Sequence, residues 1–78
     1  LDGVSEQVDV VVANILAEVI VRFAEDAAKV VKPGGYFITS GIIQKKRQEV
    51  IEVLTNCGFK IEETMLMEDW VAIIAKRM

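Results

Sequence analysis

The sequence contains no histidine and only one cysteine, Cys57. Without histidine, the serine–histidine and cysteine–histidine arrangements of nucleophilic catalysis are excluded. The usual zinc sites, which are built from cysteine and histidine ligands, are excluded as well. A single cysteine cannot form a disulfide within the chain, which favours a reducing, cytoplasmic setting. We therefore expect neither a metal site nor a catalytic side chain in this sequence.

A phosphate-binding loop and a membrane span are also missing. The 5 glycines form neither a G-x-G-x-x-G pattern nor a Walker loop, so no dinucleotide or phosphate cradle is predicted. The longest uncharged apolar stretch, Val10 to Ala17, is interrupted by Asn14 and is too short to cross a bilayer. The chain opens with neither a secretory leader nor a methionine, and we expect it to be part of a longer protein.

The charge balance is mildly acidic, with a formal net charge of −3 over 78 residues. This balance argues against electrostatic binding of nucleic acid. The basic run Lys45-Lys46-Arg47 is the exception, and three charges on one helical turn are interpreted as a solvated face. The apolar fraction of 53% is high for so short a chain. The excess predicts apolar surfaces that meet something outside this sequence.

Hydrophobic periodicity predicts a strand, a helix and a second strand in the first half of the chain. Val8 to Ala13 is β-branched and almost continuously apolar, as expected for a strand covered on both faces. From Leu16 the apolar residues follow helical spacing, until Lys32-Pro33-Gly34-Gly35 ends the helix. Tyr36 to Ser40 is predicted as a second buried strand that ends at Gly41.

The second half repeats the alternation and then closes with two strands. A helical stripe runs from Ile43 to Cys57, and Gly58 stands where a C-terminal glycine cap is expected. Phe59 to Met67 is a weaker strand candidate because charges are mixed into it. Glu68-Asp69 is a predicted turn, and Trp70 to Ala75 is a last apolar strand.

The resulting order, β-α-β-α-β-β, predicts an α/β fold. Two strand–helix–strand units imply parallel strands with right-handed crossovers, and both helices should lie on the same face of the sheet. The last two strands are joined by too few residues for a crossover, so they should be antiparallel neighbours. One sheet face would then be bare of helices. We expect half of a doubly wound, Rossmann-like domain with a mostly parallel sheet and an antiparallel last strand.

Asn14 is the leading candidate for a functional residue. It follows the first strand at its carboxyl end, where open α/β sheets bind ligands, and its amide offers a donor and an acceptor. The alternative is an N-cap of the first helix, because asparagine is a favoured cap. Ser40 and Gly41 lie at the same edge, where Gly41 could admit a substrate but more simply permits a tight bend.

The remaining notable side chains are interpreted as structural. Trp70 is expected in or near the core, and Met65 and Met67 are expected to pack. Cys57 lies on the apolar stripe of its helix, which predicts a buried thiol rather than a nucleophile.

Several sequence runs, taken in order, resemble the end of the catalytic domain of the ribosomal protein L-eleven methyltransferase family. The K-P-G-G turn is common to many S-adenosylmethionine-dependent methyltransferases, whereas the runs around Asn14, Ser40-Gly41 and Trp70 are more specific. These runs are VDVVVANILAEVI, VKPGG, FITSGII, CGF and DWVAIIAKR.

The resemblance implies that residues 1–78 are the C-terminal half of a methyltransferase domain. Its strands would be the fourth to seventh, with the last inserted antiparallel between the second and third strands of this chain. The glycine-rich cofactor loop and an N-terminal substrate-recognition domain would precede it. Asn14 would belong to the S-adenosyl-L-methionine site, and Ser40 and Gly41 would line the same pocket.

The implied reaction is methyl transfer to lysine and N-terminal amines of a ribosomal protein, with the isolated chain inactive. Two alternatives stay open: a small α/β interaction module that assembles through its bare sheet face, and half of another nucleotide-binding enzyme, such as a dehydrogenase. We expect the isolated chain to self-associate, most simply as a homodimer, because its first strand, Val8 to Ala13, would be an unpaired apolar edge.

Overall fold

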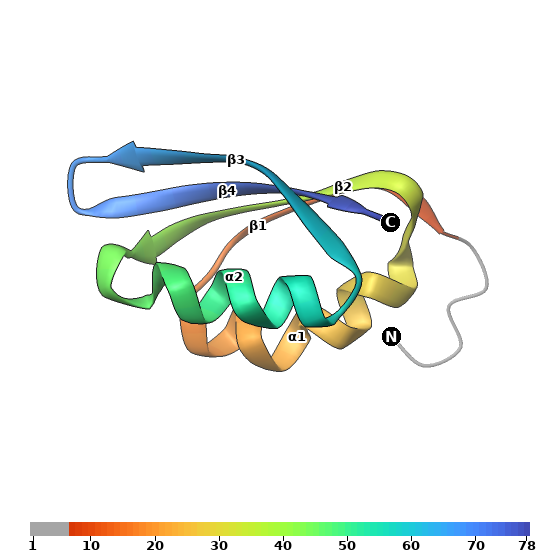
Figure 1. Ribbon diagram of the computed structural model, residues 1–78, viewed down its shortest axis with the longest axis horizontal. Coiled ribbons are helices and arrows are strands. Elements are labelled where there is room, and N and C mark those ends of the chain that lie inside the picture. The colour runs from red at the N-terminus through yellow and green to blue at the C-terminus, as the bar shows by residue number, and fades with distance from the viewer. Residues whose placement is uncertain (1–6) are drawn as a thin grey trace.

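The computed structural model describes residues 7–78, in which strands and helices alternate in the predicted order (Figure 1). The expectation about a leader concerns the start of the chain, and residues 1–6 lie outside the described range. The elements are β1 (Val8–Asn14), α1 (Ala17–Val30), β2 (Val31–Ile43), the short 3-10 helix η1 (Gln44–Lys46), α2 (Arg47–Asn56), β3 (Phe59–Met67) and β4 (Trp70–Arg77). None of the helices in this range is long and apolar enough to cross a membrane.

The strands form one sheet in the order β1-β2-β4-β3. The predicted antiparallel pairing of the last two strands is confirmed, as is the insertion of the last strand that the resemblance implied. The expectation of a mostly parallel sheet is wrong, because within residues 7–78 only β1 and β2 pair in parallel. The reason is the place of β4, whose two neighbours both run opposite to it.

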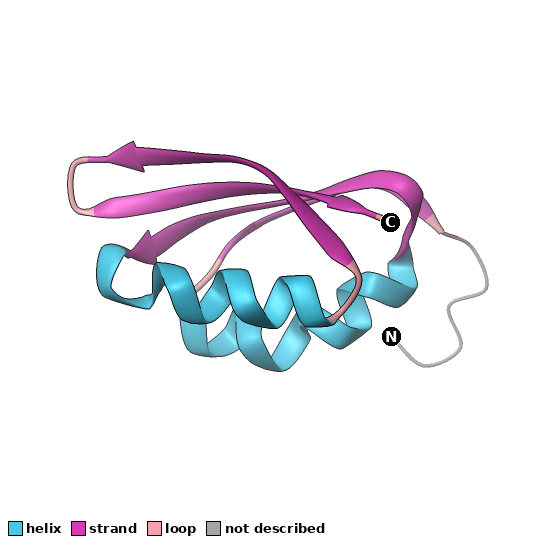
Figure 2. Cartoon of the chain, viewed as in Figure 1, coloured by secondary structure: helices cyan, strands magenta, loops and turns pink. Residues whose placement is uncertain are grey.

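Both helices cover the same face of the sheet, as predicted (Figure 2). The core lies between the two layers and contains Ile20 and Ala24 of α1, Leu54 of α2, and Phe37 and Ile73 of the sheet, all fully buried. Since α1 places its apolar side chains on one stripe, it can bury that stripe against the sheet and leave its charges in water.

Strand β2 is longer than predicted and does not end at Gly41. Its pairing with β4 shifts register between Thr39 and Ile42, which marks a β-bulge at Ser40 and Gly41. Gly41 has a φ of +79°, a left-handed conformation that suits glycine. Two residues of β2, Ser40 and Gly41, thus lie opposite one residue of β4, and the pairing of the two strands continues from Ile42. The predicted end of the first helix is confirmed, because α1 stops at Val30. The predicted start of the second strand at Tyr36 is wrong, because β2 begins at Val31 and includes Lys32-Pro33-Gly34-Gly35.

Among residues 7–78, no helix covers the opposite face of the sheet, and we call it the bare face. Strand β1 was expected to be covered on both faces, which is wrong: Val12 is 70% exposed. Trp70, expected near the core, is 37% exposed, and Met65 and Met67 are also exposed. Trp70 precedes the buried Val71 and therefore points to the opposite face, and Met67 and Met65 pair with Trp70 and Ala72 of β4, so they share the bare face. The main apolar side chains of the bare face are Val10, Val12, Ile38, Met65, Met67, Trp70 and Ile74.

Candidate functional site

The carboxyl edge of the parallel strand pair brings together the three predicted site residues. Asn14 is the last residue of β1, and its Cα pairs with that of Ser40 in β2. Gly41 follows in the bulge. Asn14 is exposed, and Ser40 and Gly41 are partly exposed. The edge therefore presents an amide and a hydroxyl beside a glycine, at the end of the sheet where α/β proteins bind ligands.

Asn14 is not the N-cap of α1. The helix begins at Ala17, its N-cap is Leu16, and that end has no side-chain cap bond. The Leu16 carbonyl accepts the first backbone bonds, from the amides of Val19 and Ile20. Two residues of β1–α1 connection separate Asn14 from the helix start, so its side chain is too early in the chain to cap it. The N-cap interpretation is wrong.

The Asn14 amide instead lies against Gly41. A Cβ atom built on Gly41 would overlap Asn14 Oδ1. Among residues 7–78 the Asn14 side chain forms no hydrogen bond. Both its donor and its acceptor are therefore available to a bound molecule.

The edge offers neutral hydrogen-bonding groups rather than titrating ones. In the described part of the chain, no group of three or more histidine, cysteine or acidic side chains is placed to hold a metal ion. Cys57 lies at the end of α2 and packs against the core. It was predicted to be buried and is partly buried. Burial raises the pKa of the Cys57 thiol, and the nearby Glu25 carboxylate raises it further, so the thiolate is disfavoured.

The basic run at the start of α2 is largely solvated, as interpreted from the sequence. Lys45 and Arg47 are exposed, and Lys46 Nζ lies 4.0 Å from Glu49 Oε1 one helical turn later. A surface pair of this kind contributes little free energy.

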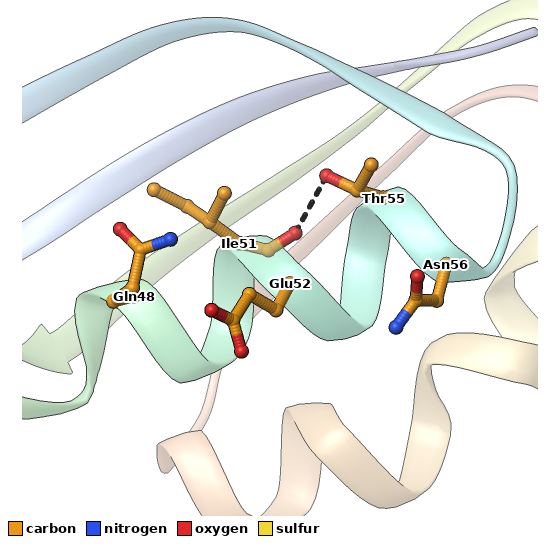
Figure 3. A pocket seen from close by; sticks show the side chains of 5 residues that line it. All are labelled: Gln48, Ile51, Glu52, Thr55 and Asn56. Atoms are coloured by element: carbon orange, nitrogen blue, oxygen red, sulfur yellow. Dashed lines mark hydrogen bonds between the residues drawn. The ribbon is translucent and has the colours of Figure 1, made fainter.

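Shallow pockets occur on the helices, away from the sheet edge. One lies on α1 and is lined by Val19, Arg22, Phe23 and Asp26. Another follows α2, where Thr55 Oγ1 donates a 2.7 Å hydrogen bond to the Ile51 carbonyl (Figure 3). Its lining residues are Gln48, Ile51, Glu52, Thr55 and Asn56. Sequence reasoning did not single out these residues, because they follow the ordinary pattern of helix surfaces. Neither pocket contains a residue of the carboxyl edge.

The sequence model of the family described as "Ribosomal protein L11 methyltransferase (PrmA)" matches residues 1–78. A ribosomal protein L11 methyltransferase of Anoxybacillus flavithermus is 62% identical over 77 residues, which are 99% of this chain and 25% of that protein. The Bacillus licheniformis protein of the same name is 61% identical, with the same coverage. The chain thus spans about a quarter of the length of these relatives.

Solved structures similar to this chain include a protein of nearly the same name as its sequence relatives. The crystal structure of a ribosomal protein L11 methylase from Lactobacillus delbrueckii subsp. bulgaricus superposes with a TM-score of 0.89 at 27% identity, over 96% of this chain and 39% of that one. The fibrillarin pre-rRNA processing protein of Methanococcus jannaschii shares the fold, with a TM-score of 0.75 at 22% identity over 95% of this chain and 38% of its own. The chain belongs to the ribosomal protein L11 methyltransferase family.

Proposed function

We propose that this chain is the C-terminal segment of an S-adenosyl-L-methionine-dependent methyltransferase that modifies lysine and N-terminal amines of a ribosomal protein. Membership of the family and the names of the bacterial relatives support the reaction and the substrate. The single observation that carries the site is the pairing of Asn14 with Ser40, which places at the carboxyl edge of the sheet an exposed amide that forms no hydrogen bond among residues 7–78.

The neutral groups at this edge can bind the amine and the uncharged part of the cofactor. An exposed amide can accept a hydrogen bond from an amine or donate one to a neutral part of the cofactor. The chain has no glycine-rich loop, and the edge residues Asn14, Ser40 and Gly41 are uncharged, so we propose that residues outside this sequence hold the charged parts of the cofactor.

Methyl transfer needs little from the protein beyond orientation. When bound, S-adenosyl-L-methionine supplies a methyl group activated by a positively charged sulfur. The bound cofactor would give up this methyl group to the lone pair of a neutral amine as its carbon–sulfur bond breaks, and the proton lost by the amine would go to water. The Asn14 oxygen would accept an N–H of the amine and so orient the amine, a role that requires no titrating side chain.

The test is Asn14→Ala in the full-length protein, with Asn56→Ala as the matched control. Asn56 is also an exposed asparagine, at the end of α2. We expect Asn14→Ala to lower kcat/KM by about 100-fold, because orientation is lost. Its free energy of unfolding should change by less than about 0.5 kcal/mol, as for other exposed side chains without partners. Activity equal to that of Asn56→Ala would contradict the proposal.

We further propose that the protein works in the cytoplasm and does not bind nucleic acid directly. The ribosomal substrate named for the bacterial relatives, the free thiol of Cys57 and the net charge of −3 support these two points.

A second proposal concerns the isolated chain, which we expect to form a homodimer. Strand β1 is at one end of the sheet order, and Val10 and Val12 on it are exposed. An apolar, β-branched edge is a template for pairing with another chain. The bare face adds apolar surface that two copies could cover by symmetric packing.

A further inference from the structure

We propose that Gly41 is a positioning residue for Asn14: it holds the Asn14 carboxamide in its orientation and contributes to methyl transfer only through that side chain. The inference rests on the proposed function of Asn14 and deepens it. The prediction that Gly41 lines a substrate pocket together with Ser40 stays a separate one.

The backbone of Asn14 is fixed, whereas its amide is not held by hydrogen bonds. Parallel pairing with Ser40 sets the position of the Asn14 Cα. The amide forms no hydrogen bond to any of residues 7–78, so its orientation depends on what it packs against. It packs against Gly41, because the space of a Cβ at that position is occupied by Asn14 Oδ1.

The bulge in β2 places Gly41 against the side-chain amide of Asn14. Register shifts between Thr39 and Ile42, and Gly41 adopts a φ of +79° within the irregular stretch. Bulges re-aim side chains next to functional sites, and here the re-aimed group is the backbone that supports Asn14. Any side chain at position 41 would push Oδ1 away, and a displacement of about 1 Å at a reacting centre can cost about 100-fold in rate.

A second glycine separates the two roles of Gly41. Gly34 has a similar φ of +88°, but a Cβ there would meet no atom within 4 Å. Substitution of Gly34 by alanine therefore introduces the same backbone strain without touching a side chain. Gly41→Ala introduces the strain and the overlap together. The difference between the two variants reports the contact with Asn14.

The experiment compares kcat/KM of the full-length enzyme for Gly41→Ala, Gly34→Ala, Asn14→Ala and the double variant Asn14→Ala with Gly41→Ala. We expect Gly34→Ala to retain activity and Gly41→Ala to lose about 100-fold. In the Asn14→Ala background, Gly41→Ala should cost no more than Gly34→Ala does, because the side chain through which it acts is gone. Equal losses for the two glycines, or an undiminished loss in the double variant, would overturn the inference.

Thermal melts of the same four proteins keep this inference distinct from the proposed function. If Asn14→Ala retains full activity, the proposed function of Asn14 fails. The positioning contact still predicts that Gly41→Ala lowers Tm more than Gly34→Ala and that the excess disappears in the Asn14→Ala background. An excess that persists there overturns the contact. If Gly41→Ala does not fold, Gly41→Asn takes its place, because asparagine tolerates left-handed φ and still carries the Cβ.

Discussion

Arg77 Nε donates a 2.8 Å hydrogen bond to the carbonyl of Ala28, which lies 49 residues earlier in the chain. The bond joins the end of β4 to the last turn of α1, where carbonyls lack intrahelical partners and favour a positive charge. It therefore fastens the last strand of the sheet to the helical layer.

Arg77→Ala should destabilise the protein by about 1.5–3 kcal/mol, the range for hydrogen bonds that involve a charged group. Arg77→Lys keeps the charge but loses the planar donor geometry, so it should recover only part of the loss. Urea unfolding of the full-length protein measures both. Full stability in Arg77→Lys would show that charge, rather than the directed bond to Ala28, is what matters.

Thr39→Val should stabilise the protein by about 1 kcal/mol, because it removes a buried hydroxyl that lacks a partner. Thr39 is fully buried, and its Oγ1 has no hydrogen-bond partner among the described residues. Thr64→Val on β3 is the control, since Thr64 is exposed. The urea midpoint should rise for Thr39→Val and stay unchanged for Thr64→Val. A lower midpoint for Thr39→Val would mean that the hydroxyl is satisfied in solution.

The isolated chain should bind S-adenosyl-L-methionine very weakly or not at all. It has no glycine-rich loop, and in residues 7–78 the paired edge residues Asn14 and Ser40 are neutral. Isothermal titration of the isolated chain, with the full-length protein as the positive control, measures this. Low-micromolar binding to the isolated chain would contradict the division of the site between this segment and the rest of the protein.

The isolated chain should sediment as a dimer whose fraction rises with concentration. Val12→Lys places a charge on the exposed edge strand and should shift the equilibrium toward the monomer. Val19→Lys is the control, because Val19 is also exposed but lies on α1, in the other layer. A chain that stays monomeric across the concentration series, or equal behaviour of the two variants, would argue against pairing through β1.

Cys57 should react with iodoacetamide at a higher pH in the folded chain than in the urea-denatured chain. Burial, and then the charge of Glu25, raise the pKa of this thiol, and the thiolate is the reactive form. Because the folded state favours the protonated thiol, the associated stability is complete at neutral pH and is lost as pH rises through the raised pKa. A pH–rate profile identical in both states would rule out this effect of burial.

Local pattern predicted the succession of elements, because strands and helices differ in hydrophobic period and because Pro33, Gly34 and Gly58 follow the two helices. Pattern alone did not give the place of β4 between β2 and β3, which came from the family resemblance. Trp70 was predicted to lie in or near the core and Met65 to pack, but both are exposed. The sequence shows that a residue is apolar, but it does not show whether the sheet face on which that residue lies is covered.

At the site, the meeting of Asn14 and Ser40 followed from the rule that parallel strands end at one edge. The contact between Asn14 and Gly41 could not be foreseen. It depends on a bulge that moves β2 out of regular register, and bulges leave no periodic signal in a sequence.

The position of β4 between β2 and β3 determines when these strands can pair during synthesis of the chain. Strands β2 and β3 are not neighbours, and each pairs with β4 instead. While the chain emerges from the ribosome, β1 and β2 can already pair, but β3 has no strand to join until Trp70–Arg77 follows it out of the exit tunnel. Translation that halts shortly before this strand would leave β3 without either of the pairings seen in residues 7–78, whereas the eight-residue strand β4 pairs with β2 and β3 together.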